Sequence, residues 1–108
     1  MQSPMDDLEG RLDELLVLLE ESGERYWHRR MSMARSGVVE NRLGGVSQVL
    51  GAYGGEDTFS DLELRPDLRT ADPQRHLLLN RRLEHLRNVL FRLADSISNA
   101  TAQGDYRP

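Results

Sequence analysis

Residues 72–97 read DPQRHLLLNRRLEHLRNVLFRLADSI, and this stretch decides the fold. Asp72 and Pro73 form a typical helix start, because an Asp side chain can accept backbone N–H groups and Pro suits the first helical turn. Apolar residues then recur at heptad spacing: Leu79, Leu83, Leu86, Leu90, Leu93 and Ile97. A stripe that persists over nearly three heptads predicts one long amphipathic helix packed along a core.

Two further helices are predicted before residue 36. The first is expected to begin at Ser3, where Ser3 and Asp6 can form a reciprocal cap, and to end at Gly23. Its apolar stripe has helical spacing: Leu8, Leu12, Leu15, Leu16 and Leu19. Residues 24–35 predict a second, shorter helix, which the pair Ser36-Gly37 is expected to break.

Residues 38–53 predict a third helix. Its apolar positions alternate by four and three residues: Val39, Leu43, Val46, Leu50 and Tyr53. Gly44 and Gly45 lie inside it, although each Gly costs about 1 kcal/mol relative to Ala in a helix interior. Either a neighbouring helix approaches closely there, or the helix kinks. The sequence therefore predicts an all-α fold, an antiparallel four-helix bundle-like single domain over residues 1–101 with a flexible tail over 102–108.

A long acidic loop separates the third helix from the fourth. Residues 50–64 read LGAYGGEDTFSDLEL, and the Gly pair at 54–55 stops the helical pattern. At least one of these two glycines is expected to have positive φ. Three apolar anchors, Phe59, Leu62 and Leu64, lie among four acidic residues. They favour an ordered loop with a short helical turn near residues 59–62, and ordered loops often carry function.

The composition excludes several classes of protein. The chain has 108 residues, of which 38% are hydrophobic and 30% charged, as is typical of a soluble, single-domain globular protein. It has no Cys, so disulfides and thiolate metal sites are excluded. The apolar run at 15–19 is too short to span a bilayer, and the acidic N-terminal segment does not resemble a signal peptide. We therefore expect a cytoplasmic protein that does not act on membranes.

No catalytic or metal-binding signature is evident. Glu24 and His28 share a helix face, but His76 and His85 lie far along the chain and do not complete a ligand set. No glycine-rich phosphate-binding motif occurs. The last helix is rich in Arg, yet the formal net charge of −4 argues against nucleic acid. We expect no enzyme activity, no metal and no cofactor.

Charge is divided into blocks along the chain. Residues 1–24 hold eight acidic residues and one Arg, and residues 43–72 hold six acidic residues and two Arg. Residues 25–42 and 73–108 carry net charges of +4 and +3. Either the acidic segments lie beside the basic helices and neutralise them, or they form an acidic face for a basic partner.

Two segments resemble a family of small, uncharacterised bacterial proteins. Residues 15–27 read LLVLLEESGERYW, and in that family a leucine-rich helix likewise leads to a Gly and a Trp. A Tyr-Gly-Gly turn, a polar stretch, an Asp and an apolar residue follow. The positions that fit this second motif are Leu50, Tyr53, Gly54, Gly55, Asp61, Leu62 and Leu64. The chain departs from the family at residues 56–58, where Glu-Asp-Thr replaces Met-Gly-Ser, and at Ser60, where Asn is usual.

Members of such families are often encoded beside secreted or contact-dependent toxins. The resemblance therefore implies an immunity protein, a binder that occludes the active site of one cognate toxin. An acidic surface would steer it to a basic cleft. The residues that we expect to bind the toxin are Glu56, Asp57, Asp61 and Glu63 in the loop and Asp13, Glu20 and Glu21 in the first helix. The alternative is a non-catalytic helical adaptor or homo-oligomerising protein that uses the stripe of the last helix, and the chain is expected to be a monomer or homodimer.

Overall fold

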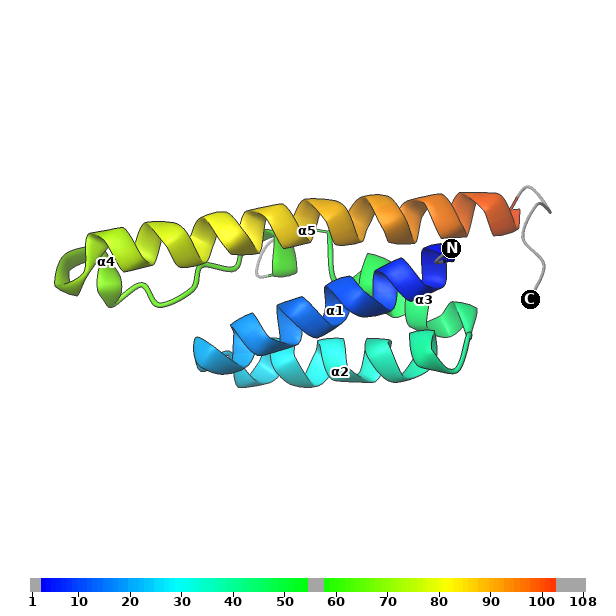
Figure 1. Ribbon diagram of the computed structural model, residues 1–108, viewed down its shortest axis with the longest axis horizontal. Coiled ribbons are helices and arrows are strands. Elements are labelled where there is room, and N and C mark those ends of the chain that lie inside the picture. The colour runs from blue at the N-terminus through cyan, green and yellow to red at the C-terminus, as the bar shows by residue number, and fades with distance from the viewer. Residues whose placement is uncertain (1–2, 55–57, 103–108) are drawn as a thin grey trace.

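The computed structural model describes residues 3–54 and 58–102, which form helices joined by turns and loops (Figure 1). The elements in chain order are α1 (Pro4–Glu21), α2 (Arg25–Val39), α3 (Leu43–Gly51), the 3₁₀ turn η1 (Phe59–Asp61), α4 (Leu68–Ala71) and α5 (Pro73–Ala102). The all-α prediction is confirmed, and η1 is the predicted helical turn. The described part of the chain also holds a helix, α4, that the periodicity did not predict, because four residues are too few to show a period.

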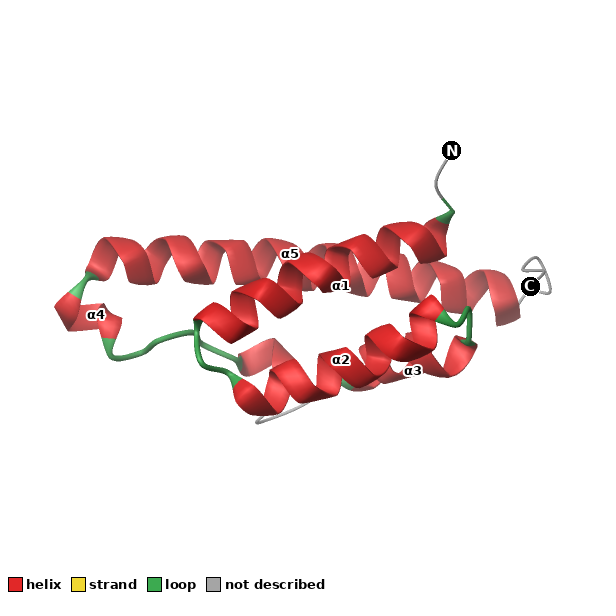
Figure 2. Ribbon diagram, turned by 60° about the horizontal axis from the view of Figure 1, so that its bottom comes forward, coloured by secondary structure: helices red, strands yellow, loops and turns green. Residues whose placement is uncertain are grey.

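The four longest helices, α1, α2, α3 and α5, form a ring in which each helix contacts the next. α2 contacts α1 and α3, while α5 contacts α1, α3 and α4 (Figures 1 and 2). α5 has 30 residues, about 45 Å at 1.5 Å per residue, and sets the long dimension of the 50 × 29 × 20 Å molecule. Its first turns and α4 project past the ends of α1 and α2 (Figure 1). The loop before α4 runs along this projecting part.

The helix starts predicted at Ser3 and at Asp72-Pro73 are confirmed. Ser3 Oγ accepts from the Asp6 N–H at 3.1 Å, and the Ser3 N–H donates to Asp6 Oδ2 at 3.4 Å, so the capping box is complete. Asp72 Oδ1 accepts from the Arg75 N–H at 3.2 Å at the start of α5. Gly23 follows α1 with a φ of +74°, the left-handed conformation that commonly ends a helix.

The predicted boundary between the second and third helices is wrong. α2 continues through Ser36 and Gly37 to Val39, and α3 begins only at Leu43. Gly37 does not break α2 because it serves a packing contact: a Cβ placed on it would lie 2.8 Å from the Cα of Gly45. Close helix approach, the first of the two alternatives for the glycines of α3, is therefore confirmed at Gly45.

The core lies inside the ring formed by α1, α2, α3 and α5. Leu83, Leu86, Leu90 and Ile97 of the α5 stripe are buried, while Leu79 and Leu93 are half-buried against it. The other large side chains of this core come from α1, α2, α3, η1 and the loop after η1: Met5, Leu8, Leu12, Leu15, Leu18, Leu19, Trp27, Met31, Val38, Val46, Val49, Phe59 and Leu64. Val39 and Leu43, predicted to face the core, are exposed because they flank the turn between α2 and α3.

Two predictions fall partly outside the described residues. α5 includes Ala102, one residue past the predicted end of the domain, and the rest of the predicted tail, 103–108, is not described. Gly54 has a φ of +151°, as expected for one glycine of the pair, and Gly55 is not described. Gly54 is not the helix cap itself, because α3 already ends at Gly51.

Candidate functional site

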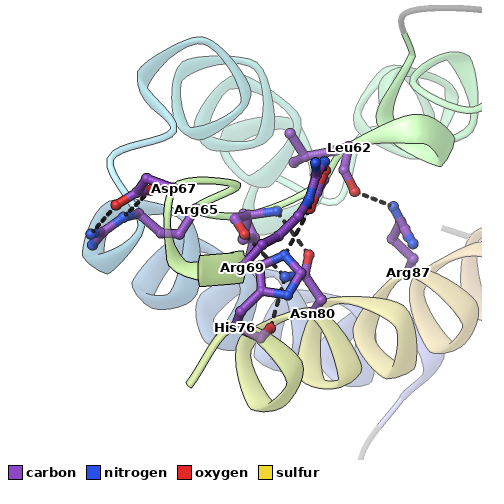
Figure 3. A network of polar contacts seen from close by, with 9 residues as sticks. Leu62, Arg65, Asp67, Arg69, His76, Asn80 and Arg87 are labelled. Atoms are coloured by element: carbon purple, nitrogen blue, oxygen red, sulfur yellow. Dashed lines mark hydrogen bonds and ion pairs between the residues drawn. The ribbon is translucent and has the colours of Figure 1, made fainter. Parts of the chain in front are cut away.

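The acidic loop is tied to α5 by side chains of that helix. Arg87 Nη1 donates to the Phe59 carbonyl oxygen at 3.1 Å. It also donates to the Leu62 carbonyl oxygen at 3.0 Å (Figure 3). A guanidinium offers several donors in a rigid plane, so one side chain can hold two carbonyls of a tight turn. Arg87 therefore fixes the backbone on both sides of Asp61.

A second clamp lies two helical turns earlier. Asn80 Oδ1 accepts from the Leu64 N–H at 2.8 Å, and Asn80 Nδ2 donates to the Leu64 carbonyl at 3.0 Å (Figure 3). This pair of bonds satisfies both backbone groups of a residue whose side chain is fully buried. Asn80 Nδ2 also donates to the His76 carbonyl at 2.8 Å, which holds the amide in place.

Glu63 joins the loop to α4 and α5. Its carboxylate accepts from the Arg69 guanidinium, and its Oε2 lies 2.7 Å from His76 Nε2 (Figure 3). Hydrogen bonds from Arg69, and then from His76, lower the pKa of Glu63 to about 2. Glu63 is therefore an ionised partner of two side chains within its own chain.

An aromatic cluster supports the start of the loop. The Phe59 ring lies 5.3 Å from Trp27 and 5.5 Å from Tyr53, and Tyr53 lies 5.2 Å from Phe91. The Tyr53 hydroxyl donates to the Arg87 carbonyl at 2.7 Å, and burial raises the pKa of Tyr53. Trp27 of α2 and Tyr53, which follows α3, thus meet through Phe59.

An open hollow lies on the surface beside this cluster. Its lining residues are Tyr53, Gly54, Ser60, Asn88, Phe91 and Arg92. Phe91 is 41% exposed, so a large ring is available to a partner. Aromatic and Arg side chains are enriched at protein interfaces, so a hollow with this lining favours protein binding.

The structure places the predicted loop residues in different environments. Asp61 is exposed at the end of η1, whereas Glu63 is half-buried in the pairs described above. Glu56 and Asp57 lie outside the described residues. Of the loop acids that the structure describes, Asp61 is thus the more accessible one.

The predicted residues of α1 are all exposed, and two of them, Asp13 and Glu20, lie beside basic side chains of α2. Asp13 pairs with Arg35 of α2, which also lies 3.6 Å from Glu9. Glu20 Oε2 is 3.8 Å from His28 Nε2, and Glu21 lines a groove between α1 and α5. These contacts agree with the interpretation in which acidic and basic helices lie side by side and neutralise each other. Asp13 and Glu20 lie beside residues of α2 and not beside the loop.

Sequence reasoning missed the residues that hold the site together. Asn80 and Arg87 are seven residues apart on α5, so they share a face beside the apolar stripe. Polar residues that repeat with the heptad at the edge of a stripe are a signal that could have identified them. Phe91 gave no such signal, because a single aromatic residue on a helix is compatible with core or surface.

Metal binding and membrane spanning find no support in the part of the chain that the structure describes. Residues 3–54 and 58–102 hold no group of three His, Asp or Glu side chains that could bind a metal ion. In those residues, no helix combines the length and apolar character needed to cross a bilayer. Comparison with protein families, curated proteins and solved structures gave no match.

Proposed function

We propose that this protein is a cytoplasmic immunity protein, which binds a cognate bacterial toxin and covers its active site. The observation that carries the proposal is the attachment of an acidic loop to α5 through Arg87 and Asn80. Side chains of α5 hold the loop backbone at three residues, so the loop can present its exposed Asp61 in a fixed position to a partner. The resemblance of residues 15–27 and 50–64 to a family of small, uncharacterised bacterial proteins implies the same function.

Pre-ordering of the loop favours tight binding. Association costs conformational entropy wherever a loop must be ordered, and a loop already held in place avoids much of that cost. The contact between the Tyr53 and Phe59 rings adds rigidity at the start of the loop. The four longest helices, α1, α2, α3 and α5, would form the scaffold as an antiparallel four-helix bundle.

The proposed contact surface is centred on the hollow. Phe91 and Arg92 belong to residue types that are enriched at protein interfaces. Asp61 lies at the exposed end of η1, and Glu56 and Asp57 follow closely after Gly54 in the sequence. These acids would attract a basic toxin cleft and raise the association rate.

The central experiment measures binding to the product of a toxin gene that adjoins the gene for this chain. We expect nanomolar or tighter affinity and protection of cells that express the toxin. Phe91→Ala should weaken binding at least about tenfold, because it removes a central aromatic contact. Met33→Ala is the matched control, since Met33 is 57% exposed on α2 and should leave affinity unchanged.

A charge reversal tests the loop separately. The double variant Glu56→Lys/Asp57→Lys should slow association and reduce its salt dependence, because electrostatic steering depends on complementary charge. Unchanged affinity in this variant and in Phe91→Ala would remove the loop from the interface. Failure of the wild-type chain to bind any neighbouring gene product would reject the immunity function.

A further inference from the structure

A second surface lies between α1 and the first turns of α5. This α1–α5 groove is lined by Glu14, Val17, Leu18 and Glu21 from α1 and by Arg75, Leu78, Leu79 and Arg82 from α5. Val17 is 58% exposed and Leu78 is 60% exposed. Two large apolar side chains therefore face solvent in the middle of the groove, between charged residues at both ends.

The charges in the groove follow a strict order. Glu14 and Glu21 are seven residues apart on α1, and Arg75 and Arg82 are seven apart on α5, which is about 10 Å on each helix. Glu14 Oε1 lies 3.7 Å from Arg82 Nη2, and the two helices run antiparallel. The same spacing sets Glu21 across from Arg75, so that one wall is acidic at both ends and the other wall is basic at both ends.

We infer that the α1–α5 groove binds a second copy of this chain. A two-fold axis parallel to the groove lays α1 of each copy over α5 of the other. Glu14 then faces Arg82 of the second copy, Glu21 faces its Arg75, and Val17 faces its Leu78. Every charged residue of the groove meets an opposite charge, and the apolar centres are buried together, as an isologous interface requires.

The alternative symmetric arrangement is repulsive. A two-fold axis across the groove lays α1 over α1 of the second copy, so Glu14 faces Glu21. It also lays α5 over α5, so Arg75 faces Arg82. Like charges placed opposite one another disfavour this arrangement, and charge order therefore selects the first one.

The groove is small for an interface. Two helical turns on each wall are less than the roughly 800 Å² per partner of a standard complex, so we expect a weak dimer with a dissociation constant on the order of 100 μM. The groove shares no lining residue with the hollow around Phe91, and Glu21 is the one residue of the groove that is also predicted from the sequence to bind the toxin.

Charge-swapped variants provide the test. Sedimentation velocity from about 1 μM to about 1 mM should show dimer formation by the wild-type chain, weakened by salt. Glu21→Arg and Arg75→Glu should each weaken self-association at least about tenfold, because each places like charges in contact. An equimolar mixture of the two variants should dimerise again, since the arginine introduced at position 21 of one copy then meets the glutamate introduced at position 75 of the other. The double variant Glu21→Arg/Arg75→Glu should also dimerise alone.

Controls make the outcomes decisive. Arg81→Glu makes the same charge reversal as Arg75→Glu, but at an exposed position of α5 outside the groove lining. It should leave self-association unchanged. Circular dichroism checks that each variant keeps its helices. A wild-type chain that stays monomeric at about 1 mM would overturn the inference, as would a mixture of single variants that fails to dimerise. Stronger association of Glu21→Arg would also overturn it, in favour of the arrangement of α1 over α1.

Discussion

Gly45 of α3 lies in direct backbone contact with Gly37 of α2. A Cβ on Gly45 would come within 2.7 Å of the Gly37 carbonyl carbon and 2.5 Å of the Val38 nitrogen. Backbone atoms of a helix cannot move aside cheaply, so the two helices can approach this closely only if both positions lack a side chain. The crossing of α2 and α3 thus depends on this pair of glycines.

Gly45→Ala should lower the free energy of unfolding by about 1–3 kcal/mol, because the added methyl group forces α2 and α3 apart. Gly44→Ala is the matched control in the same helix. A Cβ there meets no atom within 4 Å, so this variant should be neutral or slightly stabilising. Urea denaturation of both variants measures the difference, and equal midpoints would show that the crossing tolerates a side chain.

Gly54→Ala should also destabilise the protein, by about 1–3 kcal/mol, through backbone strain rather than contact. A φ of +151° belongs to a region that L side chains rarely adopt, although no atom lies within 4 Å of the Cβ position. Gly51→Ala is the control, because Gly51 lies in α3 and a Cβ there also meets no atom within 4 Å. A melting temperature for Gly54→Ala at or above that of the wild type would contradict this assignment of strain.

Asn80→Ala should cost about 1–3 kcal/mol and release the loop near Leu64. Both backbone groups of Leu64 lose their side-chain partner, and a buried polar group without a partner is destabilising. Hydrogen exchange should be faster at the Leu64 amide. Asn99→Ala, an exposed change on the same helix, should alter stability by less than about 0.5 kcal/mol. Retained protection of Leu64 in Asn80→Ala would show that the clamp does not hold the loop.

Glu63 should make stability sensitive to acid. Its pKa is lowered to about 2 from an ordinary value near 4.5, chiefly by Arg69 and then by His76. The folded state therefore binds fewer protons than the unfolded state, so the stabilisation is complete above about pH 5 and is lost as the pH falls toward 2. Thermal melts of the wild type and Glu63→Gln should differ most above pH 5 and converge near pH 2. Arg69→Ala should reduce the same pH dependence. A difference between the wild type and Glu63→Gln that stays constant at all pH values would refute the prediction.

Local signals in the sequence predicted most of the helices. The capping box at Ser3, the left-handed Gly23 and the Asp72-Pro73 start act within one helical turn, so neighbouring residues alone determine them. The α5 stripe was likewise readable, because burial of one helix face needs only a regular period. The 3₁₀ turn at η1 followed from apolar anchors in a loop.

Contacts between distant segments required the tertiary structure. Ser36-Gly37 was expected to break a helix, and only the approach of Gly45 shows why α2 continues through it. Leu78 and Leu79 are adjacent in a run of leucines, yet Leu78 is 60% exposed and Leu79 is half-buried. The order of residues along α5 defines its faces, but which face a neighbour covers depends on where α1, α3 and the loop pack.

The candidate site divides in the same way. The sequence by itself determined that an acidic loop with apolar anchors lies between helices, since glycines and aspartates are disfavoured in a helix interior. Only the tertiary structure decided that Glu63 is paired while Asp61 is exposed, and that Arg87 holds carbonyls 25 and 28 residues away. Hydrogen bonds over such separations depend on the three-dimensional course of the chain, which local preferences do not encode.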